Sequence, residues 1–210
     1  MMLRNSAIFS LLIVSLAGCV APRVKPLTGV PSQVALPQTP LPAAHTRLVF
    51  RWEYGDPLFS AKGEGVARIA PPDSVRLDFF SDGNLGGGYA ILIGDSLFTP
   101  ANGDAGRYLP PVPLLWASVG RLEVAGRDTT LRTDGDTLRA EINSASSWRA
   151  ALVGRTLVSV QRIEGGRLRE SVVRSPTVIS YRNHGARRRL TLTVLRRLED
   201  PPFDEAIWRR

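Results

Sequence analysis

Short runs of alternating apolar and polar residues, separated by turn sequences, dominate the chain from His45 onward. Between Leu48 and Tyr54 every second side chain is large and apolar, which is the period of a strand with one buried face. Similar runs recur at 75–79, 89–93, 138–142, 157–163, 168–173, 178–181 and 190–194. The separating sequences, such as Asp134-Gly135 and Gly165-Gly166, are typical of tight turns, and tight turns imply antiparallel neighbours.

This spacing predicts a mainly β domain of about ten antiparallel strands, and no internal repeat indicates a propeller or a solenoid. Some runs are apolar on both faces. In 89–93, Ala90 and Leu92 lie opposite Tyr89 and Ile91. A sheet curled around an apolar interior, or covered on both sides, uses both faces. A barrel-like sheet is therefore the favoured architecture.

One helix is predicted at 111–120, where Pro111 begins an apolar segment and Gly120 ends it. The segment reads PVPLLWASVG and is short for a helix. Two interpretations stay open: a core helix that plugs the sheet, or a movable lid over a lipid cavity.

Composition excludes several classes of protein. The chain has 210 residues, enough for one domain with a tail, and 43% of them are hydrophobic, enough for a core. With two histidines and one cysteine it cannot build a disulfide framework, a zinc cage or an iron–sulfur site. The net charge of +8 comes almost entirely from arginine, a bias that genome composition alone can produce.

The N-terminus indicates export. Arg4 precedes an apolar run, 7–17, that is too short to span a bilayer comfortably. The run ends in Leu-Ala-Gly-Cys at 16–19, which resembles the bacterial lipobox, and that resemblance implies cleavage after residue 18 and acylation of Cys19. The alternative is an ordinary secretory signal with a stray cysteine. Residues 19–43 are rich in proline and are expected to form an extended tether, with a reach of up to roughly 70 Å at about 3.1 Å per residue.

Catalytic groups are scarce. His45 lies beside the predicted tether and His184 lies in a turn sequence, and the chain has no G-x-S-x-G motif to pair with either. The glycines at 83–88 lack the lysine and the strand-to-helix context of a phosphate loop. Aspartates such as Asp82 and Asp134 are best explained as turn caps. We therefore expect a protein that is not an enzyme and holds neither cofactor nor metal; a hydrolase has low weight.

Over residues 47–208 the chain resembles the Lol-pathway family of periplasmic lipoprotein carriers and outer-membrane lipoprotein receptors, most closely the receptor. The resemblance is carried by Phe50-Arg51-Trp52, the strand at 73–78, the loop Asn84-Leu85-Gly86, the Pro-x-Pro-Leu segment at 111–114 and a terminal apolar strand before Trp208. It implies an unclosed antiparallel β-barrel with a helical lid, whose interior receives acyl chains. It also implies that Leu85 is an exposed residue used on the membrane. The receptor's longer helix ahead of Pro-x-Pro-Leu is absent, since 101–106 is loop-like, and the tether is longer.

We thus expect residues 44–210 to form a half-barrel domain that binds acyl chains of lipoproteins or lipids, for carriage or insertion at the outer membrane. The cavity residues expected from the strand pattern and the helix are Phe50, Trp52, Phe79, Ile91, Leu115 and Trp116. Outer membrane is the default because Val20 is not the aspartate that signals inner-membrane retention in some bacteria. We expect a monomer that faces the periplasm and binds no nucleic acid.

The C-terminal part is strongly basic. Arginines at 187, 188, 189, 196 and 197 flank the last strand, and we expect Arg187, Arg188, Arg189, Arg196 and Arg197 to form a face for anionic lipid or an acidic protein. The alternative is solvated charge that discourages edge pairing. The alternative function is a structural or assembly lipoprotein that docks an envelope partner through this face. Leu58-Phe59, like Leu85, is either an exposed apolar loop or inward hairpin packing.

Overall fold

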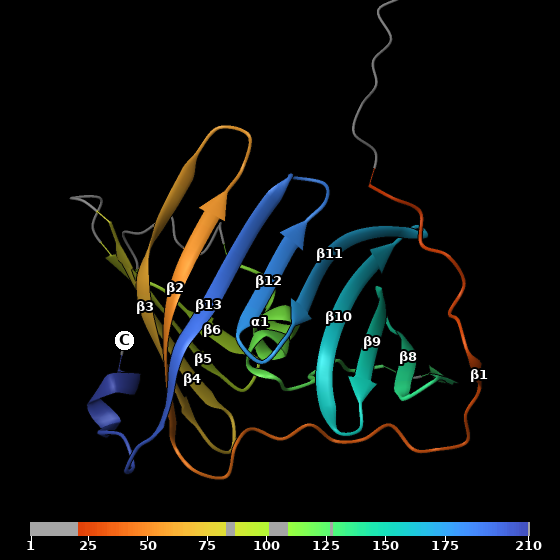
Figure 1. Cartoon of the computed structure of the whole chain (residues 1–210), viewed down its shortest axis with the longest axis horizontal. Coiled ribbons are helices and arrows are strands. Elements are labelled where there is room, and N and C mark those ends of the chain that lie inside the picture. Colours follow the sequence, from red (N-terminus) through yellow and green to blue (C-terminus); the bar gives the residue numbers. More distant parts are fainter. Residues whose placement is uncertain (1–20, 83–86, 101–108, 127, 210) are drawn as a thin grey trace, which may run out of the picture.

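One antiparallel sheet and a short helix make up the computed structural model, which describes residues 21–82, 87–100, 109–126 and 128–209 (Figure 1). The strands are β1 (Val30–Pro31), β2 (Thr46–Gly55), β3 (Ser60–Ala70), β4 (Ser74–Ser81), β5 (Gly87–Ile93), β6 (Ser96–Phe98), β7 (Asp128–Asp134), β8 (Thr137–Asn143), β9 (Ser147–Val153), β10 (Thr156–Glu164), β11 (Arg167–Arg174), β12 (Val178–Asn183) and β13 (Arg188–Glu199). The helix α1 spans Val112–Val119, and a 3-10 helix, η2, spans Glu205–Trp208. The prediction of a mainly β fold is confirmed.

The order of strands across the sheet is β1-β7-β8-β9-β10-β11-β12-β13-β2-β3-β4-β5-β6. Every neighbouring pair is antiparallel, and the last strand, β13, pairs with β2 in the middle of the sheet. The edge strands β1 and β6 do not pair with each other, so the sheet curls around α1 without closing (Figure 1). The expected unclosed antiparallel barrel with a helical cover is therefore confirmed, with thirteen described strands in place of about ten.

The concave face of the sheet carries the core. In β2 the alternation read from the sequence is correct, because Leu48, Phe50, Trp52 and Tyr54 are all buried. Full burial of one such side chain contributes about 1.5–3 kcal/mol. The core cluster continues through inward-facing residues of the other strands and the buried face of α1: Leu77, Ala90, Leu92, Leu114, Leu115, Trp116, Ala140, Trp148, Leu152, Val160, Val172, Ile179 and Leu192.

The helix α1 begins and ends as predicted. Pro111 is its N-cap, and Gly120 at φ 99° forms a left-handed C-cap that side chains with a Cβ rarely adopt. The indole N–H of Trp116 donates to the carbonyl of Gly94 at 2.9 Å, and Trp116 itself is fully buried. The helix covers the concave face of the sheet with residues 114–118 buried, a packing that both interpretations of this segment require.

The proline-rich segment 21–43 differs from the free tether that was expected. Its backbone lies against the sheet: β1 pairs with β7, and the amide N–H of Val24 donates to the carbonyl of Gly166 at 2.9 Å. Ala21 and Leu41 are buried. Proline leaves the carbonyls and the neighbouring N–H groups available, so an extended segment can dock through the backbone without large apolar side chains.

Antiparallel pairing brings three turns to one end of the sheet, namely 56–59 between β2 and β3, 165–166 between β10 and β11, and 184–187 between β12 and β13. This end, which we call the rim, lies at the top of Figure 1. The described strands, α1 and the core cluster all lie at or after Ala21. A chain that begins at Ala21 therefore contains the complete fold described here.

Candidate functional site

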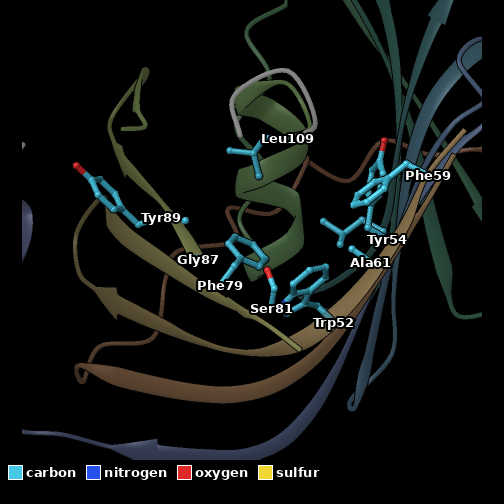
Figure 2. Close-up of a pocket in the computed structure, with 11 residues that line it drawn as sticks. Trp52, Tyr54, Phe59, Ala61, Phe79, Ser81, Gly87, Tyr89 and Leu109 are labelled. Atoms are coloured by element: carbon cyan, nitrogen blue, oxygen red, sulfur yellow. The ribbon is translucent and has the colours of Figure 1, made fainter. Parts of the chain in front are cut away.

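A cavity of about 330 Å³ lies on the concave face, between the sheet and the segment that leads into α1 (Figure 2). This volume falls in the range of roughly 300–1,000 Å³ that ligand sites usually occupy. The walls come from β2, β3, β4, β5, β13, the β2–β3 turn and Leu109, and the lining residues are Trp52, Tyr54, Phe59, Ala61, Phe79, Ser81, Gly87, Gly88, Tyr89, Leu109 and Leu190. Most of them belong to the rim ends of their strands, so the cavity lies near the rim.

Aromatic side chains form the floor of the cavity, and their polar atoms bond elsewhere. The ring of Phe79 meets that of Trp52 edge-on, with centroids 6.0 Å apart. The Trp52 indole N–H donates to the carbonyl of Glu64 at 3.0 Å, and the Tyr54 hydroxyl donates to Asp56 at 2.8 Å. The rings therefore offer carbon surface to the cavity, and the chemistry suits an apolar ligand.

Glycines flank Phe79 on both neighbouring strands, and one of them, Gly88, lines the cavity. The register places Gly65 of β3 on one side of Phe79 and Gly88 of β5 on the other. Cross-strand neighbours share a face of the sheet, so larger residues at these two positions would fill the concave surface next to the ring. At Gly65 an added Cβ would lie 2.4 Å from the ring of Phe50, so even alanine does not fit without movement.

The cavity continues beneath α1 as two small voids. One of about 20 Å³ shares Phe79, Leu109 and Leu190 with the main cavity, and the next, of about 10 Å³, shares Ile179 and Leu192 with the first. Each is about the size of one water molecule. A small displacement of α1 away from the sheet would join all three into one longer channel.

Arg174 of β11 holds the C-terminal end of α1 on the sheet. Its Nε donates to the carbonyl of Ser118 at 3.1 Å and its Nη1 donates to the carbonyl of Leu157 at 3.2 Å. Burial lowers the pKa of the Arg174 guanidinium, and the nearby positive charge of Arg197 lowers it further. The side chain therefore connects the C-terminal end of α1 to β10 and β11.

A buried polar network lies on β11 and β12 beside the cavity. The Glu170 carboxylate accepts from the Tyr181 hydroxyl at 2.6 Å and from the Asn183 amide at 3.1 Å, and it forms an ion pair with Arg162 at 2.8 Å. Burial, together with the hydrogen bond to Glu170, raises the pKa of Tyr181, so its hydroxyl stays protonated. Both hydrogen bonds reach Oε1, whereas the buried Oε2 has the charge of Arg162 beside it and no hydrogen-bond donor.

The structure separates the six predicted cavity residues into three groups. Trp52 and Phe79 line the cavity. Phe50, Leu115 and Trp116 are buried in the core next to it, and Leu115 borders the 20 Å³ void. Ile91 is fully buried but lies on the face opposite Ala90 and Leu92, which belong to the core cluster, so it does not point into the barrel.

Two predicted positions, Cys19 and Leu85, lie outside the described residues. Of the predicted apolar pair, Leu58 is exposed, whereas Phe59 lines the cavity. The lining residues that the sequence did not single out include Ala61, Ser81 and Leu109, which lie at strand ends and before α1. Leu190 could have been found from the sequence, because strand alternation places it on the same face as the buried Leu192.

The five arginines expected to form one anionic-partner face lie at the two ends of β13. Arg187, Arg188 and Arg189 are at the rim, whereas Arg196 and Arg197 are near the opposite end. Arg196 lies seven positions after Arg189 along the strand, a length of about 23 Å at ~3.3 Å per residue. The five arginines therefore form two separate clusters, and their role toward an anionic partner stays a prediction.

Outside the cavity, Ser171 Oγ lies 3.3 Å from His184 Nε2, a contact that the sequence did not reveal. Burial lowers the pKa of His184, as does the neighbouring Arg182, so the imidazole is neutral at pH 7. Ser171 is itself buried.

Other candidate sites are less suited to a ligand. A hollow of about 370 Å³ between β3, β4 and η2 is lined by charged side chains. In it, Asp78 forms ion pairs with both Arg68 and Arg76. Among the described residues, no three histidine, cysteine or carboxylate side chains gather closely enough to hold a metal ion. No helix in the described part of the chain is long and apolar enough to cross a bilayer.

Comparison with known proteins finds a similar fold in solved structures. No protein-family model matches the chain, and no curated protein matches it in sequence. A LolA superfamily protein from Nitrosomonas europaea matches with a TM-score of 0.56 and 10% identity, covering 82% of this chain and 93% of that one. A DUF1329 family protein from Desulfovibrio piger matches with a TM-score of 0.50 and 7% identity, covering 80% and 90%. At these identities the likeness establishes the fold: this chain folds like a LolA superfamily protein.

Proposed function

We propose that the protein binds the acyl chain of a lipoprotein or lipid in its concave cavity and releases it unchanged. The observation that carries the proposal is the cavity itself, about 330 Å³ in volume and walled by aromatic and aliphatic carbon. The indole N–H of Trp52 and the hydroxyl of Tyr54 are already bonded within the protein. The fold shared with a LolA superfamily protein supports the same conclusion.

Binding of this kind is hydrophobic and needs no covalent step. Each methylene group that leaves water contributes about 0.8 kcal/mol. The acyl chain would run over Trp52 and Phe79 toward α1, and the polar part of the ligand would stay at the rim, in water. Displacement of α1 would admit a longer chain by opening the two voids beneath it.

The same proposal includes lipid anchoring of the protein and delivery of its cargo to a membrane. Acylation of Cys19 would hold the domain on a membrane, with the outer membrane facing the periplasm as its place, and the cargo would be carried to or inserted into that membrane. Mass spectrometry of the purified full chain tests the first step: two or three acyl chains on Cys19 are expected, and Cys19→Ser should be unacylated. Leu85 remains the membrane-contact residue implied by family resemblance.

The cavity is tested with a matched pair of variants on β4. Phe79 lines the cavity, whereas its neighbour Phe80 points to the other face and is 56% exposed. In a chain beginning at Ala21, Phe79→Glu should abolish uptake of a fluorescent fatty acid, and Phe80→Glu should leave uptake unchanged. Native mass spectrometry should detect co-purified lipid in the parent chain and in Phe80→Glu only.

Circular dichroism of both variants checks that the fold is intact. A parent chain that contains no lipid and takes up no fatty acid would refute the acyl-binding proposal. That result would favour a structural lipoprotein that docks an envelope partner through a basic face.

A further inference from the structure

The β2–β3 turn presents apolar side chains to solvent at the rim. Leu58 is 97% exposed and Phe59 is 48% exposed. The turn is nevertheless well ordered, because Asp56 Oδ1 accepts from the backbone N–H groups of Leu58 and Phe59, both at 2.8 Å, and the Asp56 N–H donates to the Phe59 carbonyl. Leu58 is therefore held away from the protein surface by a fixed turn.

The neighbouring turn supplies positive charge. Arg187 and Arg189 are exposed and Arg188 is half-buried, and Arg189 pairs across the sheet with Gly55, next to the apolar turn. Arg182 is exposed on the same hairpin. The acidic group closest to the apolar tip is Asp56, whose carboxylate is engaged by its own turn.

The N-terminal part of the described chain also reaches the rim. Val24 and Pro22 bond to the backbone at Gly166 and Leu168, beside the β10–β11 turn. Ala21 therefore lies at the same end of the sheet as the tip formed by Leu58 and Phe59 (Figure 1). A lipid attached two residues earlier, at Cys19, would approach a membrane from this end.

The cavity meets the same surface. Phe59 is half exposed at the tip and also lines the cavity, where Figure 2 shows its ring beside that of Tyr54. The centroids of these two rings are 6.1 Å apart. An acyl chain that leaves a bilayer beneath the tip would contact Phe59 before it contacts Trp52.

We propose that the rim docks on an anionic lipid bilayer, with Leu58 and Phe59 inserted among the acyl chains and Arg187, Arg188 and Arg189 on the headgroups. Apolar side chains suit the acyl region of such a bilayer, and the arginines beside them suit its anionic headgroups. This docking proposal rests on the exposure of Leu58 and Phe59 and on the charge of the neighbouring arginines. The path of an acyl chain past Phe59 rests in addition on the proposed function.

Insertion is tested with a single label. A chain that begins at Ala21 contains no cysteine, so Leu58→Cys carries one environment-sensitive dye without further changes. Vesicles of phosphatidylglycerol and phosphatidylethanolamine should shift the dye emission to the blue. The same dye at Leu198→Cys, an exposed position near the far end of β13, should show no shift. Equal shifts at both positions, or none at Leu58→Cys, would overturn the proposal.

The charge contribution is tested by two double variants with the same change in net charge. Arg187→Glu/Arg189→Glu alters the rim, and Arg196→Glu/Arg197→Glu alters the opposite end of the same strand. Removal of one interfacial arginine should weaken vesicle binding about fivefold, so the rim variant should lose at least about 25-fold in sedimentation with these vesicles. The second variant should bind anionic vesicles like the parent chain. On neutral phosphatidylcholine vesicles, both variants and the parent chain should bind equally weakly. Equal losses in the two variants would refute a defined docking surface.

Leu58→Ser separates docking from acyl binding. Loss of a membrane-inserted leucine should weaken vesicle binding about tenfold to hundredfold, whereas uptake of a fatty acid from solution should be unchanged. If the parent chain docks but takes up no fatty acid, the docking proposal survives and the acyl-binding proposal fails. If it takes up fatty acid but never docks, the reverse holds.

Discussion

Replacement of Ala61 by leucine should shorten the longest acyl chain that the cavity accepts. Ala61 lines the cavity from β3, and leucine adds three carbon atoms to its side chain. We therefore expect the longest chain that the variant accepts to be about three methylene groups shorter than in the parent chain.

The magnitude follows from the transfer free energy. About 0.8 kcal/mol per methylene group corresponds to a roughly fourfold change in Kd per carbon. Affinity should therefore rise about fourfold with each carbon until the cavity is full, and then level off. For a chain that fills the parent cavity, loss of three methylene groups costs about 2.4 kcal/mol, or about 60-fold in Kd.

Displacement of a fluorescent fatty acid by saturated fatty acids of increasing length measures both curves. Short acids that leave room in the cavity should bind the parent chain and Ala61→Leu equally. Ala145→Leu, at an exposed turn between β8 and β9, is the control for an added leucine elsewhere. A Kd independent of chain length, or an equal loss at all lengths in Ala61→Leu, would show that acyl chains do not enter this cavity.

Three further predictions concern the fold around the site. Gly65→Ala should destabilise the protein by about 1–3 kcal/mol in chemical denaturation, because its Cβ would lie 2.4 Å from the Phe50 ring and 2.6 Å from the Asp78 carbonyl; Gly185→Ala, without such contacts, should stay within about 0.5 kcal/mol. Arg174→Met removes both hydrogen bonds to Ser118 and Leu157, so amides of α1 should exchange faster with deuterium, and unchanged exchange would mean that Arg174 does not hold the helix. The hydroxyl of Tyr54 and two backbone N–H groups lower the pKa of the Asp56 carboxyl in the folded protein. The carboxylate therefore stabilises the turn fully above its ordinary pKa of 3.8, and this stabilisation is lost as the pH falls through the lower pKa of the folded state. Protection of the Leu58 amide should therefore be constant between about pH 5 and 8, and absent in Asp56→Ala; protection that titrates within this range would contradict the assignment.

Strands with one apolar face could be predicted from the sequence because the inward residues of β2 from Leu48 to Tyr54 are all large and apolar. The strand β3 has no such pattern. Gly63 and Gly65 replace inward side chains there, and the reason for them is contact with Phe80 and Phe50, which lie far away along the chain. Contacts between distant parts of the chain leave no local pattern, so β3 could not be recognised from its own residues.

Ile91 shows a second limit. In a strand that is apolar on both faces, local sequence does not tell which face points inward, and a shift of one residue exchanges them. Docking of residues 21–43 was missed for another reason, because its hydrogen bonds join backbone atoms and leave no side-chain pattern. The arginines of β13 looked like one cluster in sequence, but an extended strand separates its two ends.

The pairing of β13 with β2 has a consequence for how the chain folds. One half of the sheet consists of β2 to β6 and the other of β7 to β12, and each is a local meander that can form as soon as it is synthesised. The two halves join only when residue 189 pairs with residue 55, close to the end of the chain. Until then, β2 and β12 are open edges, ready to pair with any other strand. The final strand therefore acts as the closing step of assembly, and a chain cut before β13 should accumulate as two unjoined meanders that aggregate.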